Sequence, residues 1–153
     1  MNLSQPSDRL TSSRSPSSLG APVAEDRPNP LGDEHRVCSA ADVPDGGRVL
    51  ATVAGLRIGI FNRGGRYFAL HDRCPHQGAP LCRGELTGVL EAVGPGFDFR
   101  WSRDGDFVRC PWHGWEFEIE SGRSLTNARV RARTYAVVVR GGEVFVRLGA
   151  RGA

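Results

Sequence analysis

The sequence predicts an all-β domain made of small antiparallel sheets. From residue 33 onward, short runs of β-branched and apolar residues alternate with glycine-rich turns, which is typical of strands joined by hairpins. No segment of ten or more residues in this region shows the apolar period of an amphipathic helix. A chain of 153 residues, 39% of them hydrophobic, has room for one domain with a tail.

Residues 1–32 are expected to form a disordered tail, because serine and proline dominate them and large apolar residues are few. The domain should then occupy residues 33–153. The N-terminus lacks the basic start, apolar run and small-residue cleavage site of a secretory signal. No stretch approaches the roughly 18–20 consecutive apolar residues of a membrane helix. We therefore expect a cytoplasmic protein without a membrane partner, in which cysteines and histidines more often bind metal than form disulfides.

The expected strands follow in chain order from the positions of the turns. Cys38 lies in a first strand, and Ser39–Val43 can form one helical turn. The later strands are the apolar runs Arg48–Ala54, Leu56–Asn62, Arg66–His71, Leu86–Val93, Phe97–Trp101, Trp115–Ile119, Tyr135–Val139 and Val144–Leu148. The glycine pairs at 64–65 and 141–142, and the Gly-Pro-Gly at 94–96, are hairpin signals.

Two short boxes contain the residue types that carry chemistry. The first is Cys74–Gly78 (CPHQG), and the second is Cys110–Trp115 (CPWHGW). Each box supplies one thiolate and one imidazole from a loop rich in glycine and proline, after a predicted strand. This symmetry indicates two facing loops that hold one shared site.

Two thiolates and two imidazoles can bind either of two metal centres. They can hold a tetrahedral zinc ion, or a [2Fe–2S] cluster with two cysteines on one iron and two histidines on the other. Zinc fingers usually place both cysteines in one short box and both histidines in another, whereas each box here is mixed. The mixed boxes favour the iron–sulfur cluster, and a structural zinc-binding module remains the alternative.

The boxes and their flanks, Asp72–Leu81 and Arg109–Phe117, resemble the signature of the Rieske [2Fe–2S] family. The resemblance covers about residues 35–149 and is to Rieske ferredoxins and to the Rieske domains of ring-hydroxylating oxygenases. It implies a Rieske-type domain with two cluster-binding loops, and four cofactor-binding, metal-ligating residues. By the family pattern, Cys74 and Cys110 ligate the buried iron, and His76 and His113 ligate the outer iron near the surface.

The resemblance also shows where this sequence departs from the respiratory Rieske proteins. Their loop disulfide should be absent, because Trp112 occupies one cysteine position and Cys82 lies too far along the chain. High-potential members have Ser and Tyr where this chain has Trp115 and Phe117, which supply no hydroxyl donor to the cluster sulfurs. A reduction potential near the low end of the Rieske range, about −150 mV, follows. The tryptophans are otherwise expected to shield and pack.

The remaining cysteines and histidines are assigned structural roles. Cys38 is expected to be a small buried hydrophobe, and Cys82 a partly buried free thiol. His71 ends a strand and should be structural, and His35 should lie on the surface.

Two further features lie near the boxes. The segment 85–106 separates the boxes by more residues than in most ferredoxins of the family, and it is predicted to be an inserted hairpin. The hairpin is either a structural flap, a partner interface or a shield for the cluster edge. Arg123, Arg129, Arg131 and Arg133 form a basic run that is either a solvated face or a docking site for an acidic redox partner.

These features predict an electron carrier rather than an enzyme. The 40 residues after His113 contain no histidine, so the mononuclear iron site of a complete oxygenase is not expected, and no glycine-rich dinucleotide loop is visible. A net charge of +3 is too small to indicate a nucleic-acid partner. We expect a Rieske-type ferredoxin that takes one electron from a flavin reductase and passes it to an oxygenase or a similar terminal oxidoreductase. The alternatives are a permanently bound small Rieske subunit of a larger oxidoreductase and the zinc module.

Overall fold

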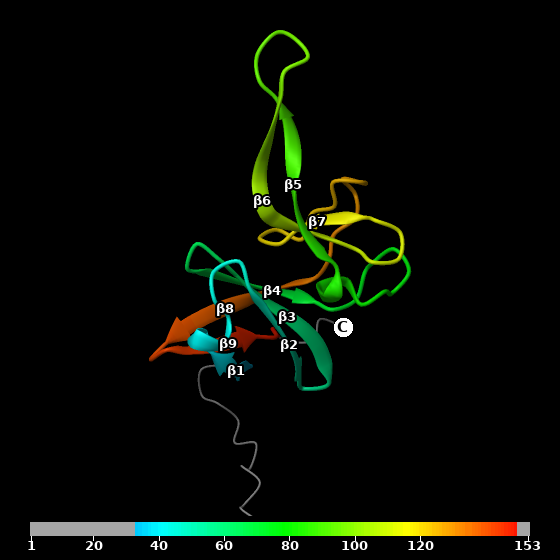
Figure 1. The fold of residues 1–153 in the computed structure, drawn as a ribbon. Helices are drawn as coiled ribbons and strands as arrows, with labels where there is room; N and C mark the ends of the chain where they lie inside the picture. The colour runs from blue at the N-terminus through cyan, green and yellow to red at the C-terminus, as the bar shows by residue number, and fades with distance from the viewer. Residues whose placement is uncertain (1–32, 150–153) are drawn as a thin grey trace, which may run out of the picture.

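The computed structural model describes residues 33–149, and the predicted disordered tail at 1–32 lies outside this range. The prediction of an all-β domain is confirmed, because the described residues contain nine strands, two short 3-10 turns and no α-helix (Figure 1). Within this range no helix is long and apolar enough to cross a membrane.

The strands form two antiparallel sheets. The large sheet has the order β1-β9-β8-β4-β3-β2 and the small sheet the order β5-β6-β7. The strands of the large sheet are β1 (Glu34–Ser39), β2 (Arg48–Val53), β3 (Leu56–Arg63), β4 (Arg66–His71), β8 (Thr134–Arg140) and β9 (Glu143–Arg147). Those of the small sheet are β5 (Glu85–Ala92), β6 (Phe99–Arg109) and β7 (Glu116–Glu118). The 3-10 turns are η1 (Ala40–Asp42) and η2 (Leu81–Arg83).

Every predicted strand overlaps an observed one, and the expected helical turn is η1. Ser39 caps η1, because its hydroxyl accepts from the Ala41 N–H while Asp42 accepts from the Ser39 N–H. The main difference is β6, which continues to Arg109 where the sequence predicted a strand ending at Trp101. A bulge explains the error, since Arg103 and Gly105 have φ values of 52° and 80° and interrupt the alternation of side chains.

The central strands of the large sheet separate two apolar cores. Ile60 and Ala69 point into a core shared with β1, β8 and β9. Their neighbours Phe61 and Leu70 point into a second core, shared with the small sheet and the two boxes. Successive strand residues face opposite sides of a sheet, and both sets are buried because each side is covered by one of the two cores. The second core therefore positions the boxes against a rigid support.

The segment 85–106 forms most of a long β5–β6 hairpin that projects from the body of the protein (Figure 1). Leu90 pairs with Trp101 and Ala92 pairs with Phe99 across it. Arg63 of β3 donates to the Asp104 carbonyl and pairs with Asp106 at 3.5 Å, and these contacts attach the bulge to the large sheet. The predicted hairpin is thus present and is fixed at its base.

Candidate metal centre

The two boxes form loops with the same backbone conformation. In the first cluster loop (residues 74–79), the Cys74 N–H donates to the Ala79 carbonyl at 2.8 Å, and the Gly78 N–H donates to the Cys74 carbonyl at 2.7 Å. In the second cluster loop (residues 110–115), Cys110 N–H donates to the Trp115 carbonyl at 2.7 Å, and Gly114 N–H to the Cys110 carbonyl at 3.0 Å.

A glycine closes each loop in the left-handed region. Gly78 has a φ of 80° and Gly114 a φ of 71°, which L-residues with a Cβ adopt only at a cost. The predicted symmetry of the two loops is therefore present in the backbone.

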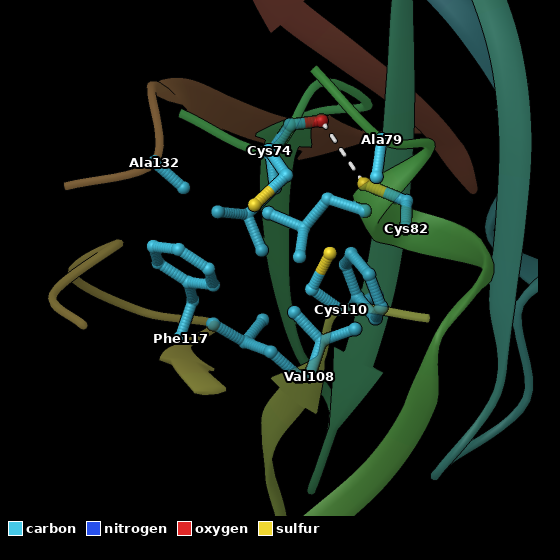
Figure 2. Close-up of a cluster of buried hydrophobic side chains, with 11 residues drawn as sticks. Cys74, Ala79, Cys82, Val108, Cys110, Phe117 and Ala132 are labelled. Atoms are coloured by element: carbon cyan, nitrogen blue, oxygen red, sulfur yellow. Dashed lines mark hydrogen bonds between the residues drawn. The ribbon is translucent and has the colours of Figure 1, made fainter. Parts of the chain in front are cut away.

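The two thiols of the boxes lie side by side in the second core. Cys74 and Cys110 are 1% and 2% exposed, and both belong to the apolar cluster drawn in Figure 2. Burial raises the pKa of the Cys74 thiol, and a hydrogen bond to the Cys110 sulfur raises it too, whereas a hydrogen bond from the backbone N–H of His76 lowers it. Two buried thiols in the same core can bind one metal ion, which would compensate the charge of both thiolates.

The two imidazoles lie at the surface, outside the core that contains the thiols. His76 and His113 are exposed, and their ring centroids are 4.9 Å apart with an interplanar angle of 80°. The loops thus place the four predicted site residues as two pairs, a buried sulfur pair and an exposed nitrogen pair, and among residues 33–149 no group of three or more such side chains is close enough to hold one metal ion. The site has one inner and one outer pair of donors.

Aromatic rings distinguish the two histidines. Trp115 stacks on His76 with centroids 4.4 Å apart and planes at 9°, and Phe117 lies behind Trp115 at 6.4 Å. Besides the ring of His76, His113 has an edge contact with Trp112, at 6.4 Å and 86°, and Trp112 is 59% exposed. The predicted packing role is therefore confirmed for Trp115, whereas Trp112 lies mostly in solvent. No sequence pattern indicated the stack on His76.

Asp72 supports the first cluster loop through its buried side chain, a role that the sequence prediction missed. Its side chain is 3% exposed, and Oδ1 accepts the Cys82 backbone N–H at 2.8 Å. Arg57 lies 3.9 Å from the other oxygen. A lone carboxylate between an apolar strand and the first box was the available signal, because a buried carboxylate needs donors.

Cys82 is fully buried, so the prediction of a partly buried thiol is wrong. The turn η2 directs its side chain against Gly59, where a Cβ would lie 2.6 Å from the Cys82 Cβ. Its sulfur donates to the Leu70 carbonyl at 3.6 Å, the dashed line in Figure 2, and burial raises the pKa of the Cys82 thiol to about 12. All four cysteines are free, as expected for the absent loop disulfide.

The other predicted roles are structural. Cys38 is buried in β1, as predicted. His71 ends β4 in edge contact with Tyr135, and burial together with the nearby Arg133 lowers its pKa. His35 is partly buried rather than fully on the surface, with Nε2 3.1 Å from an Asp33 carboxylate oxygen.

The donor set fits a [2Fe–2S] cluster with mixed ligation. Such a centre needs two thiolates for one iron and two imidazoles for the other. The buried pair Cys74 and Cys110 and the exposed pair His76 and His113 are the residues that could supply these donors, at two depths.

Known proteins resemble this chain over most of its length. Residues 33–136 match the Rieske [2Fe-2S] domain. The chain is 32% identical over 112 residues to the 3-phenylpropionate/cinnamic acid dioxygenase ferredoxin subunit of Escherichia coli (strain K12), covering 72% of this chain and 90% of that one.

Two solved structures share the fold. The first is a complex of reduced oxygenase and oxidized ferredoxin in carbazole 1,9a-dioxygenase, with a TM-score of 0.60 at 26% identity, covering 75% of this chain and 93% of the matched one. The second is the Sphingomonas yanoikuyae B1 ferredoxin, with a TM-score of 0.57 at 25% identity, covering 74% and 97%. With a family match over more than half of its length, the chain belongs to the Rieske [2Fe-2S] domain family.

Proposed function

We propose that this protein is a one-electron carrier in which Cys74 and Cys110 hold the buried iron and His76 and His113 hold the outer iron of a Rieske cluster. The observation that supports the assignment most strongly is the separation by depth, with the thiols in the core and the imidazoles in solvent. When bound, a Rieske cluster supplies one reversible one-electron redox centre, whose potential is raised by the two neutral imidazoles.

The protein's own residues divide the remaining work. The apolar core around Cys74 and Cys110 excludes water from the thiolate side, with Phe117 and Val108 fully buried beside them. The exposed rings of His76 and His113 present the other side to a partner protein. The two loops hold both pairs through backbone hydrogen bonds that depend little on the side chains between them.

The relatives support an oxygenase system as the setting. One is named as the ferredoxin subunit of a dioxygenase, and one solved structure contains a ferredoxin together with its oxygenase. We propose that this chain likewise takes electrons from a flavin reductase and delivers them to an oxygenase. None of the four cysteines, all of which the structure describes, forms a disulfide, which supports a reducing compartment such as the cytoplasm.

Protein-film voltammetry of the anaerobically purified chain tests the carrier function. We expect a single reversible one-electron wave, near the low end of the Rieske range at about −150 mV. A chain that shows no wave, or that reduces oxygen or nitrite catalytically by itself, would contradict the proposal.

A further inference from the structure

Three loops gather around the buried thiols and form one end of the molecule, here called the cluster end: residues 73–84, 110–115 and 121–133. All three contribute to one apolar core, through Cys74 and Cys82, Cys110, and Ala132 respectively (Figure 2). The third loop is also attached to the strand that leaves the second, because the Leu125 N–H donates to the Glu116 carbonyl at 2.9 Å.

The cluster end contains arginines but no Asp or Glu. The six arginines, all exposed, are Arg73, Arg83, Arg123, Arg129, Arg131 and Arg133. Among residues 33–149, none of these six forms an ion pair, whereas eight of the ten other arginines do. Their charge is therefore available to a partner.

The carboxylates that border the three loops are already paired. Arg57 pairs with Asp72, Arg66 with Glu120, Arg103 with Glu118, and Arg109 with both Glu85 and Glu116. Outside the loops, the described residues carry ten arginines and fourteen carboxylates, a net charge of −4, against +6 within the loops. The molecule thus has a positive cluster end and a negative remainder, although its total charge is small.

A groove suited to acidic side chains lies between the third loop of the cluster end and strands β6 and β7. The cavity has a volume of about 400 Å³ and is lined by Arg103, Phe107, Glu118, Arg123, Leu125 and Arg131. Glu118 is held by Arg103, so the guanidinium groups of Arg123 and Arg131 are free to bind carboxylates. Leu125, which is 48% exposed, supplies an apolar contact beside them.

From this charge separation, we propose that the cluster end is a docking surface for a carboxylate-rich face of the protein's redox partner. Arg123 and Arg131 receive acidic side chains in the groove. The separated charge turns the exposed histidines toward the partner during the encounter, which increases the association rate more than the final affinity. The inference rests on the proposed carrier function, because it assumes that the partner must approach the histidine pair.

A binding measurement tests the surface itself, whether or not the chain holds a cluster. The probe is a deca-glutamate peptide, titrated calorimetrically at low and at physiological salt. We expect Arg131→Glu to weaken binding about tenfold, and Arg100→Glu, an equal charge change on the β5–β6 hairpin, to weaken it less than about twofold. Equal effects of the two variants, or wild-type binding that does not weaken with salt, would overturn the proposal.

A kinetic measurement on the iron-loaded protein tests the link to electron transfer. The reduced protein is mixed with ferricyanide, an anionic oxidant, and separately with hexaamminecobalt(III), a cationic one. We expect the ferricyanide rate to fall with added salt and with Arg131→Glu, while the cobalt rate rises in both cases. The opposite pattern would overturn the docking surface. A chain that binds no iron would overturn the proposed function, and the peptide-binding measurement alone would then test the docking surface.

Discussion

The two cluster loops have one backbone but two environments. Both are closed by the same pair of hydrogen bonds and by a left-handed glycine. The ring of His76 is covered by the stacked Trp115, whereas the ring of His113 has edge contacts, with His76 and with an exposed Trp112. Equal backbones indicate that both loops present a donor pair in the same way, while unequal surroundings leave His113 as the more open histidine.

The supports beneath the loops differ as well. The first loop is held by a buried carboxylate, Asp72, which accepts the Cys82 N–H in the turn that follows the loop. The second loop connects β6 and β7, whose ladder pairs Arg109 with Glu116. A buried polar contact and a strand ladder thus produce the same loop by different means.

The largest expected effect concerns the three cysteine thiols of the second core. We expect Cys74→Ser and Cys110→Ser each to abolish iron binding, because each removes a ligand of the proposed buried iron. Cys82→Ala should retain the iron, because its buried thiol points at Gly59 and Leu70. Iron and sulfide assays on the three purified variants check this. Loss of iron from Cys82→Ala would contradict the assignment of Cys74 and Cys110, without Cys82, to the iron.

The next effect compares the two supports. Asp72→Ala leaves the buried N–H of Cys82 without an acceptor, which should lower the free energy of unfolding by about 1–3 kcal/mol. Glu116→Ala removes a partly exposed ion pair with Arg109, and its cost should be about 0–1 kcal/mol. Urea unfolding measures both, and an equal loss in the two variants would remove the distinction between the supports.

The glycines test whether the loop backbones are truly equivalent. Gly78→Ala and Gly114→Ala should each cost about 1–2 kcal/mol, because both positions require the left-handed region. Steric contact should add little, since a Cβ at Gly78 would meet Arg73 at an ordinary 3.6 Å and one at Gly114 would meet nothing within 4 Å. A cost at one glycine only, in the same unfolding assay, would mean that one loop can relax.

The smallest effect concerns the tryptophans. Trp115→Leu removes a stacked ring pair and should cost about 0.5–1.5 kcal/mol beyond the lost burial. Trp112→Leu lies at an exposed site and should change the free energy of unfolding by less than about 0.5 kcal/mol. In addition, only Trp115→Leu should alter the electron paramagnetic resonance signal of the reduced protein, whereas Trp115→Phe should restore it. An altered signal in Trp112→Leu would place His113 in the more restrained environment.

The sequence was sufficient for features that depend on local pattern. Glycine pairs marked the hairpins, and the two mixed boxes identified four residues that the fold places as a buried thiol pair and an exposed imidazole pair. It failed where distant segments decide the outcome. Cys82 is buried because Gly59, on another strand, leaves room for its side chain, and Trp115 meets His76 only after two loops converge. The bulge at Arg103–Gly105 hid the length of β6, since it breaks the alternation that defines a strand.

The division of donors between an inner thiol pair and an outer imidazole pair is tested most directly by magnetic resonance. The measurement is electron–nuclear double resonance on dithionite-reduced protein labelled with ¹⁵N-histidine, together with iron, sulfide and zinc assays. We predict about two irons and two sulfides per chain, a signal averaging below the free-electron value, and couplings from two histidine nitrogens that become one in His113→Cys. A colourless protein with one tightly bound zinc, or a cluster without histidine couplings, would contradict this account.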